Sequence, residues 1–415
     1  MQCCILLVDK ENNPKQPTEK GKGGGKMHEF NLKTYISNIC DNGTYTREYL
    51  SQYAGYKKPA GFSKWLNNED SEIADFNDLI RLLDKIDSDR TCEFLAKYSM
   101  SVSPTHATAK SLLEYLSSNR ELDYMKALIE RMESSKSASG KDWARAYALQ
   151  HEWQKNYYTI DVNKHLKEIA KLKTSDKYLE LFVNVMKCNC YYHNEDNKMA
   201  YEIANELLSE LKDIEDGYIK NAYSAKVNEV LSFISLWVKN KPEEARENAE
   251  AVIKANIGEA KDAFAYSVIG HSYYYTSYEK AVKYISKSKE LYVKLGEDFK
   301  GAVIDADETL EKIKIFWMKK DVSEGFKCIE NELLFKAING ENISQLLGES
   351  KEKINCGATY NLIKGYSEKG NDTLLQSMVQ FLKKGDTFSA YVPMLELKKR
   401  GYNEVLLNEW INFHS

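Results

Sequence analysis

The sequence predicts an all-α protein in which an N-terminal helix-turn-helix is followed by a right-handed tetratricopeptide-like superhelix. Glycine and proline are scarce, at 21 and 6 of 415 residues, while charged residues make up 29%, as is typical of water-exposed helices. Apolar stripes with helical spacing also recur along most of the chain. They begin near Thr108, Trp143, Tyr178, Ala222 and Ala263, at intervals of 35, 35, 44 and 41 residues, which are the periods of stacked helix pairs.

Residues 1–26 differ from the rest of the chain. A short apolar run, 3–8, is followed by a polar stretch that ends in glycines and lysines before Met27. This is not a phosphate-binding loop, because Met27 follows Lys26 where the loop needs Ser or Thr for magnesium. We interpret the stretch either as an untranslated leader, with Met27 as the true start, or as an ordinary disordered tail.

Residues 27–90 are expected to form a helix-turn-helix DNA-binding domain. A helical stripe that includes Leu50 stops at Gly55, a residue suited to a tight turn, and Pro59 then opens a second helix. Phe62 and Trp65 begin the apolar face of that helix, so its polar face points outward.

This segment is locally basic, although its flanks are acidic. The charges from residue 44 to residue 68 sum to +3, and the predicted DNA-contacting residues are Lys57, Lys58, Ser63, Lys64 and Asn67. The alternative is a plain helical hairpin with a solvated lysine face. Helix-turn-helix spacing alone does not separate the two.

Residues 91–401 are predicted to form the superhelix. The clearest unit is 263–296, where Gly270 permits close approach of two helices, and 222–255 repeats it with a second helix that starts at Pro242. Later pairs are expected at 323–347, 358–385 and 388–411. Because each pair buries its apolar face only against its neighbours, the stack should present a concave inner surface that suits an extended peptide.

Residues 402–415 are expected to form a C-terminal capping and dimerisation helix. The last helices carry apolar residues that we expect on the surface, namely Leu395, Leu397, Val405, Leu406, Trp410 and Ile411. An unburied end of a solenoid needs a polar cap or a partner, so a homodimer is predicted.

Several function classes are excluded by the sequence. The net charge of −4 rules out a generally basic nucleic-acid-coating protein, and no apolar stretch is long enough to cross a bilayer. Eight cysteines without repeated spacing favour reduced thiols in a cytoplasm. No catalytic signature is present, so neither an enzyme nor a cofactor is expected. Cys188, Cys190 and His193 are interpreted as buried or idle side chains rather than a metal site.

Three segments together resemble a known family. They are residues 49–67 (YLSQYAGYKKPAGFSKWLN), 263–280 (AFAYSVIGHSYYYTSYEK) and 385–407 (GDTFSAYVPMLELKKRGYNEVLL). In this order they are similar to the peptide-pheromone receptors of Gram-positive bacteria and their phages, and most of all to the arbitrium receptors, the AimR family. The resemblance implies a homodimer that binds operator DNA and controls lysis and lysogeny. It also implies a secreted and reimported hexapeptide that binds the receptor and stops gene activation.

The resemblance also implies peptide-binding positions. Asn331 and Glu332 fall where the family contacts its peptide, Asp386 matches an acid that pairs with a basic peptide side chain, and Phe388 lies beside it. His271 replaces a frequent Asn. Lys261 stands in for an Arg that would bind the peptide carboxylate.

Some of these roles also have a physical basis. Asn228 and Asn331 each offer a donor and an acceptor to a peptide backbone, and Glu332 with Asp386 would clamp one Arg if the superhelix brought them together. Taken singly, each acid also fits a solvated helix residue. Two rival functions remain open: a peptide-regulated protein that binds a response regulator without touching DNA, and a purely structural tetratricopeptide adaptor.

Overall fold

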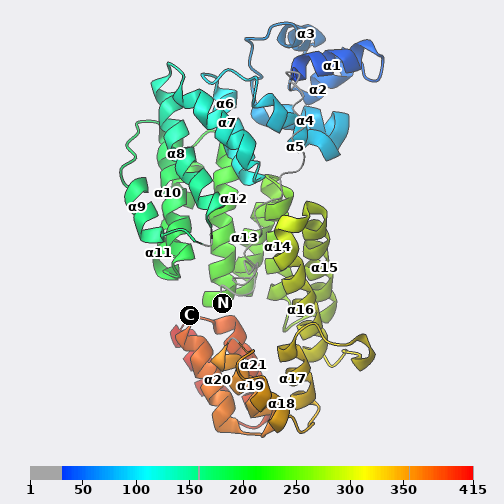
Figure 1. The fold of residues 1–415 in the computed structure, drawn as a ribbon, viewed down its shortest axis with the longest axis vertical. Helices are drawn as coiled ribbons and strands as arrows, with labels where there is room; N and C mark the ends of the chain where they lie inside the picture. The colour runs from blue at the N-terminus through cyan, green and yellow to red at the C-terminus, as the bar shows by residue number, and fades with distance from the viewer. Residues whose placement is uncertain (1–29, 158, 355, 415) are drawn as a thin grey trace. The chain divides into compact units, whose positions relative to one another are not determined.

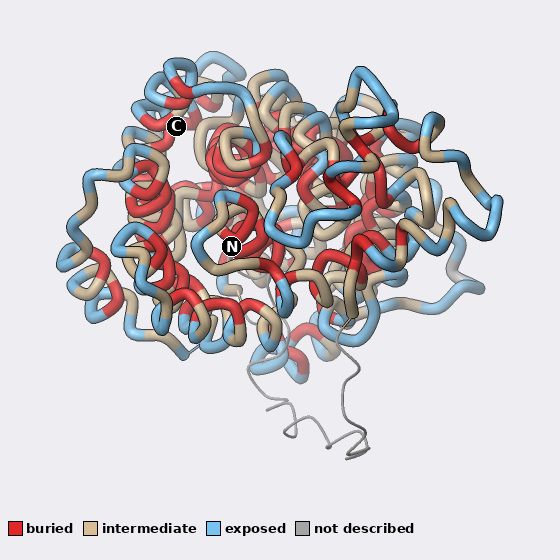
Figure 2. Tube along the Cα trace, turned by 90° about the horizontal axis from the view of Figure 1, so that it is seen from above, coloured by how far each residue is buried: buried red, intermediate tan, exposed pale blue. Residues whose placement is uncertain are grey.

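Every secondary-structure element in the described residues, 30–157, 159–354 and 356–414 of the computed structural model, is helical (Figure 1). The predicted leader, 1–26, lies outside this range. None of the described helices is long and apolar enough to cross a membrane. Figure 2 shows the buried residues as stripes along the helices, with exposed residues at many of the turns. The helical stripes in the sequence therefore correspond to buried helix faces.

The chain divides into two compact units, and the division falls inside one helix, between Val227 and Asn228. We call residues 30–227 the N-terminal unit and residues 228–414 the C-terminal unit, and describe each by itself. The predicted domain bounds after residues 90 and 401 stay predictions, because this division follows compactness and does not test them.

The N-terminal unit begins with five α-helices of 7 to 12 residues and continues with α-helices of 8 to 18 residues. They are α1 (Leu32–Asp41), α2 (Arg47–Tyr53), α3 (Pro59–Leu66), α4 (Phe76–Asp87), the 3-10 turn η1 (Ser88–Arg90), α5 (Thr91–Tyr98), α6 (Ala107–Ser118), α7 (Leu122–Glu133), α8 (Ala138–Lys155), α9 (Val162–Ile169), α10 (Lys177–His193), α11 (Asn197–Lys212) and the first part of α12 (Tyr218–Phe233).

Aromatic rings and one buried ion pair hold this unit together. Tyr147 of α8 stacks on Phe182 of α10 at 4.2 Å between ring centroids, and its hydroxyl donates to Glu114 of α6 at 2.7 Å. Glu114 is fully buried, and Lys226 of α12 pairs with it at 2.6 Å. A buried carboxylate without such partners would be strongly destabilising, so this pair fixes how α6, α8 and α12 meet.

The C-terminal unit contains the remaining helices. They are the end of α12, the π-helical turn η2 (Ile234–Val238), α13 (Pro242–Ala255), α14 (Glu259–Ser272), α15 (Tyr278–Leu295), η3 (Glu297–Phe299), α16 (Lys300–Phe316), η4 (Val322–Glu324), α17 (Ile329–Ile338), α18 (Ser344–Glu349), α19 (Gly357–Ser367), α20 (Asn371–Lys383), α21 (Thr387–Lys399) and α22 (Glu404–His414).

The predicted helix pairs are present, but several helices begin earlier than their apolar stripes. The starts expected near Thr108 and Tyr178 lie within one residue of the observed ones, and Pro242 opens α13 as predicted. The helices expected near Trp143, Ala222 and Ala263 begin four or five residues earlier. The first turns of α8 and α14 are largely polar, so apolar periodicity cannot locate them, whereas α12 begins with Tyr218 and Ile219 ahead of the stripe predicted near Ala222.

One part of the predicted C-terminal surface is wrong. Leu397 and Ile411, expected on the outside, are 0% and 2% exposed and belong to a core formed by α19 to α22. They lie on the faces of α21 and α22 that point into this core. The outer face of α22 does carry exposed Val405, Leu406 and Trp410, and Leu395 is half-buried.

Candidate DNA-binding surface and peptide-binding site

Helices α2 and α3 form the predicted helix-turn-helix. The Thr46 side chain accepts a hydrogen bond from the Tyr49 N–H and so caps the start of α2. The turn after α2 contains Gly55 at φ +73°, a left-handed conformation, and a Cβ there would clash with the Asp78 carboxylate. Pro59 occupies the first turn of α3. The predicted turn and helix start are therefore confirmed.

The amphipathic pattern of α3 is also confirmed. Phe62, Trp65 and Leu66 are buried. Of the five predicted DNA-contacting residues, Lys57, Lys58, Lys64 and Asn67 are exposed and Ser63 is half-buried.

The three lysines of this surface are exposed and have no ion-pair partner among the described residues, unlike the arginines of the neighbouring helices. Within the described part of the first five helices, Arg47, Arg81, Arg90 and Lys97 each pair with a carboxylate, whereas no acid lies within ion-pair distance of Lys57, Lys58 or Lys64. Unpaired exposed ammonium groups remain available to phosphates, because binding them does not require an existing ion pair to break.

In the C-terminal unit, Phe388 lies at the centre of an aromatic cluster. Its ring centroid is 5.0 Å from Tyr275, 5.8 Å from Tyr274, and 6.0 Å from both Trp237 and His271. The Tyr275 hydroxyl donates to the Phe388 carbonyl at 2.8 Å. The structure thus brings together two predicted peptide-binding residues, His271 and Phe388, from α14 and α21.

His271 is a buried and neutral member of this cluster. Burial lowers its pKa to about 4. Its Nδ1 lies 2.8 Å from the Ser267 carbonyl, so Nδ1–H donates and Nε2 is left as an acceptor. A cavity with room for about one water molecule adjoins His271 and is also lined by Ser288 and Asp305.

Asp386 starts α21 beside the cluster and is almost fully buried. Its carboxylate accepts the Ser389 N–H at 2.7 Å and so serves as the N-cap. Burial raises the pKa of Asp386 to about 6, against the opposing effect of the Ser389 hydrogen bond. The neighbouring Thr387 hydroxyl donates to the Trp237 carbonyl at 2.9 Å, which ties α21 to the π-helical turn.

The other predicted peptide-binding residues make their own contacts outside the aromatic cluster. Asn331 is fully buried and donates to Glu311 at 2.9 Å, while Glu332 pairs with Lys336 at 2.6 Å. A contact between Asn331 and a ligand would require rearrangement of its present hydrogen bonds. Glu332 pairs with Lys336, and the Asp386 carboxylate caps α21, so the two acids do not share a partner in this structure. The clamp that they would form around a peptide Arg stays a prediction.

The two remaining predicted peptide-binding residues, Lys261 and Asn228, are both associated with Glu229 of α12. Lys261 of α14 pairs with Glu229 of α12 at 2.5 Å, and Asn228 precedes Glu229 and is buried. A ligand carboxylate at Lys261 would compete with Glu229. The predicted residues therefore take part in different sets of contacts within the C-terminal unit.

Sequence reasoning missed Trp237 and Tyr275. Trp237 lies in η2, and π-helical turns often occur at functional sites. The repeated tyrosines at 273–275 are the only sequence signal for Tyr275, and buried tyrosines of this kind commonly fill the space between helices.

Comparison with known proteins identifies the family. The chain is 23% identical over 380 residues to the AimR transcriptional regulator of Bacillus phage phi3T, covering 90% of this chain and 99% of that protein. It is 24% identical over 367 residues to the AimR transcriptional regulator of Bacillus phage SPbeta, covering 85% and 92% of the two chains.

Solved structures confirm the fold class. A structure of SeMet-phAimR superposes with a TM-score of 0.75 at 23% identity, covering 92% of this chain and all of that one. A structure of phAimR-Ligand gives a TM-score of 0.63 at 22% identity, covering 81% of this chain and all of that one.

The sequence model of the family described as AimR transcriptional regulator-like matches residues 91–399, well over half of the chain. The family consists of transcriptional regulators, which confirms the prediction that the protein is not an enzyme. The resemblance first seen in three short segments is thus confirmed, and the chain belongs to the AimR transcriptional regulator family.

Proposed function

We propose that this regulator binds operator DNA as a homodimer through α2 and α3 and is switched off by a short signalling peptide of about six residues. In this proposal the switch controls lysis and lysogeny of a phage. The observation that carries DNA binding is the set of three unpaired lysines around the outward face of α3. Phosphate contacts by such lysines position a helix in the major groove, and Ser63 and Asn67 would then reach base edges.

The peptide site is proposed in the C-terminal unit, at the aromatic cluster around Phe388 and the buried acid Asp386. Aromatic side chains supply apolar contact area at low entropic cost, and a buried carboxylate selects a basic residue. That a structure of phAimR-Ligand has a related fold supports ligand binding by a protein of this architecture.

The experiment measures binding of the full-length protein to DNA fragments flanking its own gene, by fluorescence anisotropy at several salt concentrations. Replacing Lys57, Lys58 and Lys64 by Ala should weaken binding strongly and flatten the salt dependence by about one unit of slope per lost contact. Adding the peptide encoded next to the gene should release the wild-type protein from DNA.

A charge-matched control replaces three paired lysines of the same unit, Lys97, Lys126 and Lys171, by Ala. This control should keep both the affinity and the slope. If the wild-type protein binds none of the fragments but binds the peptide, the alternative that it acts on a response regulator without DNA is favoured. Equal slopes for the two triple variants would refute the assignment of the DNA-contacting lysines.

A further inference from the structure

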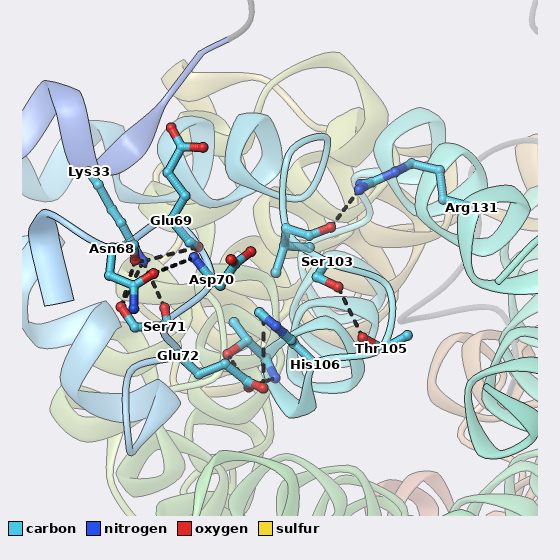
Figure 3. Close-up of polar contacts among 12 residues, drawn as sticks. Lys33, Asn68, Glu69, Asp70, Ser71, Glu72, Ser103, Thr105, His106 and Arg131 are labelled. Carbon is cyan, nitrogen blue, oxygen red and sulfur yellow. Dashed lines mark hydrogen bonds and ion pairs between the residues drawn. The ribbon is translucent and has the colours of Figure 1, made fainter. Parts of the chain in front are cut away.

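Lys33 of α1 is a buried lysine whose ammonium group reaches the loop that follows α3. The residue is 5% exposed. The Nζ atom donates to the carbonyls of Asn68 at 2.6 Å, Ser71 at 2.7 Å and Glu69 at 3.3 Å, and lies 3.2 Å from the Ser71 hydroxyl (Figure 3). We call residues 67–72 the tether loop. Four acceptors of one short loop thus converge on a single ammonium group.

These contacts hold the end of α3 as well as the loop. The Lys33 ammonium lies 5.2 Å from the ring centroid of Trp65, which is in the core face of α3. The Ser71 hydroxyl contacts the Trp65 carbonyl at 3.1 Å. A cation at the C-terminus of a helix also interacts favourably with the helix dipole. Lys33 therefore fixes where α3 ends relative to α1.

Among the described residues no carboxylate lies within ion-pair distance of Lys33, so the groups that contact its charge are carbonyl dipoles and one hydroxyl. Burial lowers the pKa of Lys33, while the nearby Glu69 and Asp70 carboxylates oppose that shift. A buried ammonium is costly unless its donors are satisfied. The loop conformation that supplies three carbonyls is consequently required for Lys33 to stay buried and charged.

The other end of the tether loop is attached to α6. The Glu72 carboxylate accepts hydrogen bonds from the Thr108 N–H at 3.0 Å and the Thr108 hydroxyl at 3.1 Å. His106, the N-cap residue of α6, makes no capping hydrogen bond with its own side chain. Glu72 therefore caps α6 from a position 36 residues earlier in the chain, and a negative charge suits that end of a helix.

We propose that Lys33 and Glu72 are positioning residues for DNA binding, which hold the recognition helix α3 in a fixed place between α1 and α6 through the tether loop. This inference rests on the proposed DNA-binding function of α3. Neither residue needs to touch DNA. If α3 shifts, base contacts that depend on direction are lost first, whereas phosphate contacts that depend on charge persist.

The test compares specific and non-specific DNA binding by full-length variants. The specific probe is the gene-flanking duplex that the wild-type protein binds most tightly, and the non-specific probe is a scrambled duplex of equal length. Lys33→Met and Glu72→Ala should each weaken specific binding about tenfold, the loss expected when about one base contact is withdrawn. Non-specific affinity and the salt slope should match wild type.

Lys97→Met is the matched control, because it removes a lysine of the same unit that pairs with Glu93 and not with the tether loop. It should leave both affinities unchanged. Amide hydrogen exchange, measured without DNA, should quicken in 67–72 and the end of α3 for Lys33→Met, and in the first turn of α6 for Glu72→Ala. Rescue by Glu72→Gln, whose amide oxygen still accepts hydrogen bonds, supports a role for the cap itself.

The outcomes separate this inference from the proposed function. Folded variants with wild-type specific affinity would overturn it, and so would a reduced salt slope, which would make Lys33 a phosphate contact. If the wild-type protein binds no DNA, the proposed function fails. Amide exchange rates that are unchanged in the variants would show, in addition, that Lys33 and Glu72 do not hold the tether loop in place. Should Lys33→Met fail to fold, Glu72→Ala carries the same comparison.

Discussion

At the scale of single residues, Asp386 differs from the other buried acids of the chain. Glu114 pairs with Lys226 at 2.6 Å and Glu311 pairs with Lys320 at 3.1 Å, and all four side chains are at most 7% exposed. In the described residues no cation lies within ion-pair distance of Asp386. A buried acid without a paired cation lowers stability, and such groups concentrate at functional sites.

This difference leads to a prediction for Asp386→Asn. Because the folded-state pKa, about 6, is above the ordinary value of 3.8, the contribution of Asp386 to stability is fully present below pH 3.8 and is lost as the pH rises through 6. The ionised acid then costs roughly 3 kcal/mol at pH 7. Since Asn also caps helices, Asp386→Asn should stabilise the protein at pH 7 and should lose this advantage near pH 4.

Denaturant unfolding at pH 4 and pH 7 measures this effect, and calorimetry with the peptide encoded next to the gene measures binding. The more stable variant should bind the peptide at least thirty-fold more weakly if the peptide has a basic residue at this place. Asp372→Asn, which changes an exposed acid of α20, is the control for both measurements. Full-strength peptide binding by Asp386→Asn would show that this acid has no role in recognition.

The identity of Asp386 as a candidate could be predicted from the sequence, but its burial could not. The resemblance to the family placed an acid at this position. Its burial depends on the packing of α21 against η2, where Thr387 contacts the Trp237 carbonyl 150 residues away in sequence. No local pattern reports such a contact, and the same holds for the contact between Glu72 and Thr108.

At the scale of elements, local sequence patterns predicted the helix pairs. The irregular parts of the helices, such as the π-helical turn η2, depend on tertiary packing. Gly55 specified the turn, because few residues adopt a positive φ, and Pro59 specified the start of α3, because its fixed φ suits a first helical turn that does not need its N–H. The π-helical turn η2 was missed, since one inserted residue hardly changes apolar periodicity. The close approach at Gly270 was predicted correctly, because small residues allow helices to pack tightly.

Gly270 therefore yields a prediction at this scale. A Cβ at Gly270 would lie 2.7 Å from the Ile285 side chain and 2.9 Å from the Ile285 backbone nitrogen. A backbone atom cannot move aside cheaply, so Gly270→Ala should destabilise the protein by about 1–3 kcal/mol. The control is Gly348→Ala on α18, where a Cβ meets nothing within 4 Å and better helix propensity should stabilise by up to about 1 kcal/mol. Thermal unfolding of both variants makes the comparison, and equal shifts would contradict tight packing of α14 on α15.

At the scale of the whole molecule, the outer face of α22 is the surface that most needs a partner. Of the nine large apolar side chains that are exposed in the described residues, four lie on this one helix: Val405, Leu406, Trp410 and Phe413. Their partners in the same helix, Leu407 and Ile411, are buried in the C-terminal unit. A contiguous apolar face of this kind marks an interaction site, and the second copy required by the proposed homodimer is its simplest occupant.

The corresponding prediction concerns assembly. In a two-fold symmetric interface, each substituted residue lies near its own copy, so Val405→Glu with Leu406→Glu would introduce four like charges into the contact. Acids are tolerated in the first turn of a helix, so α22 itself should still form. Repulsion between desolvated like charges costs several kcal/mol, which should raise the dimer dissociation constant roughly 100-fold or more.

Light scattering across a dilution series should show a dimer for the wild-type protein and a monomer for this variant. The charge-matched control, Val293→Glu with Ile304→Glu, changes apolar side chains that are 58% and 47% exposed on α15 and α16, and it should remain a dimer. A dimer that persists in the α22 variant would place the interface elsewhere. A wild-type protein that is monomeric at every concentration would contradict the proposed homodimer itself.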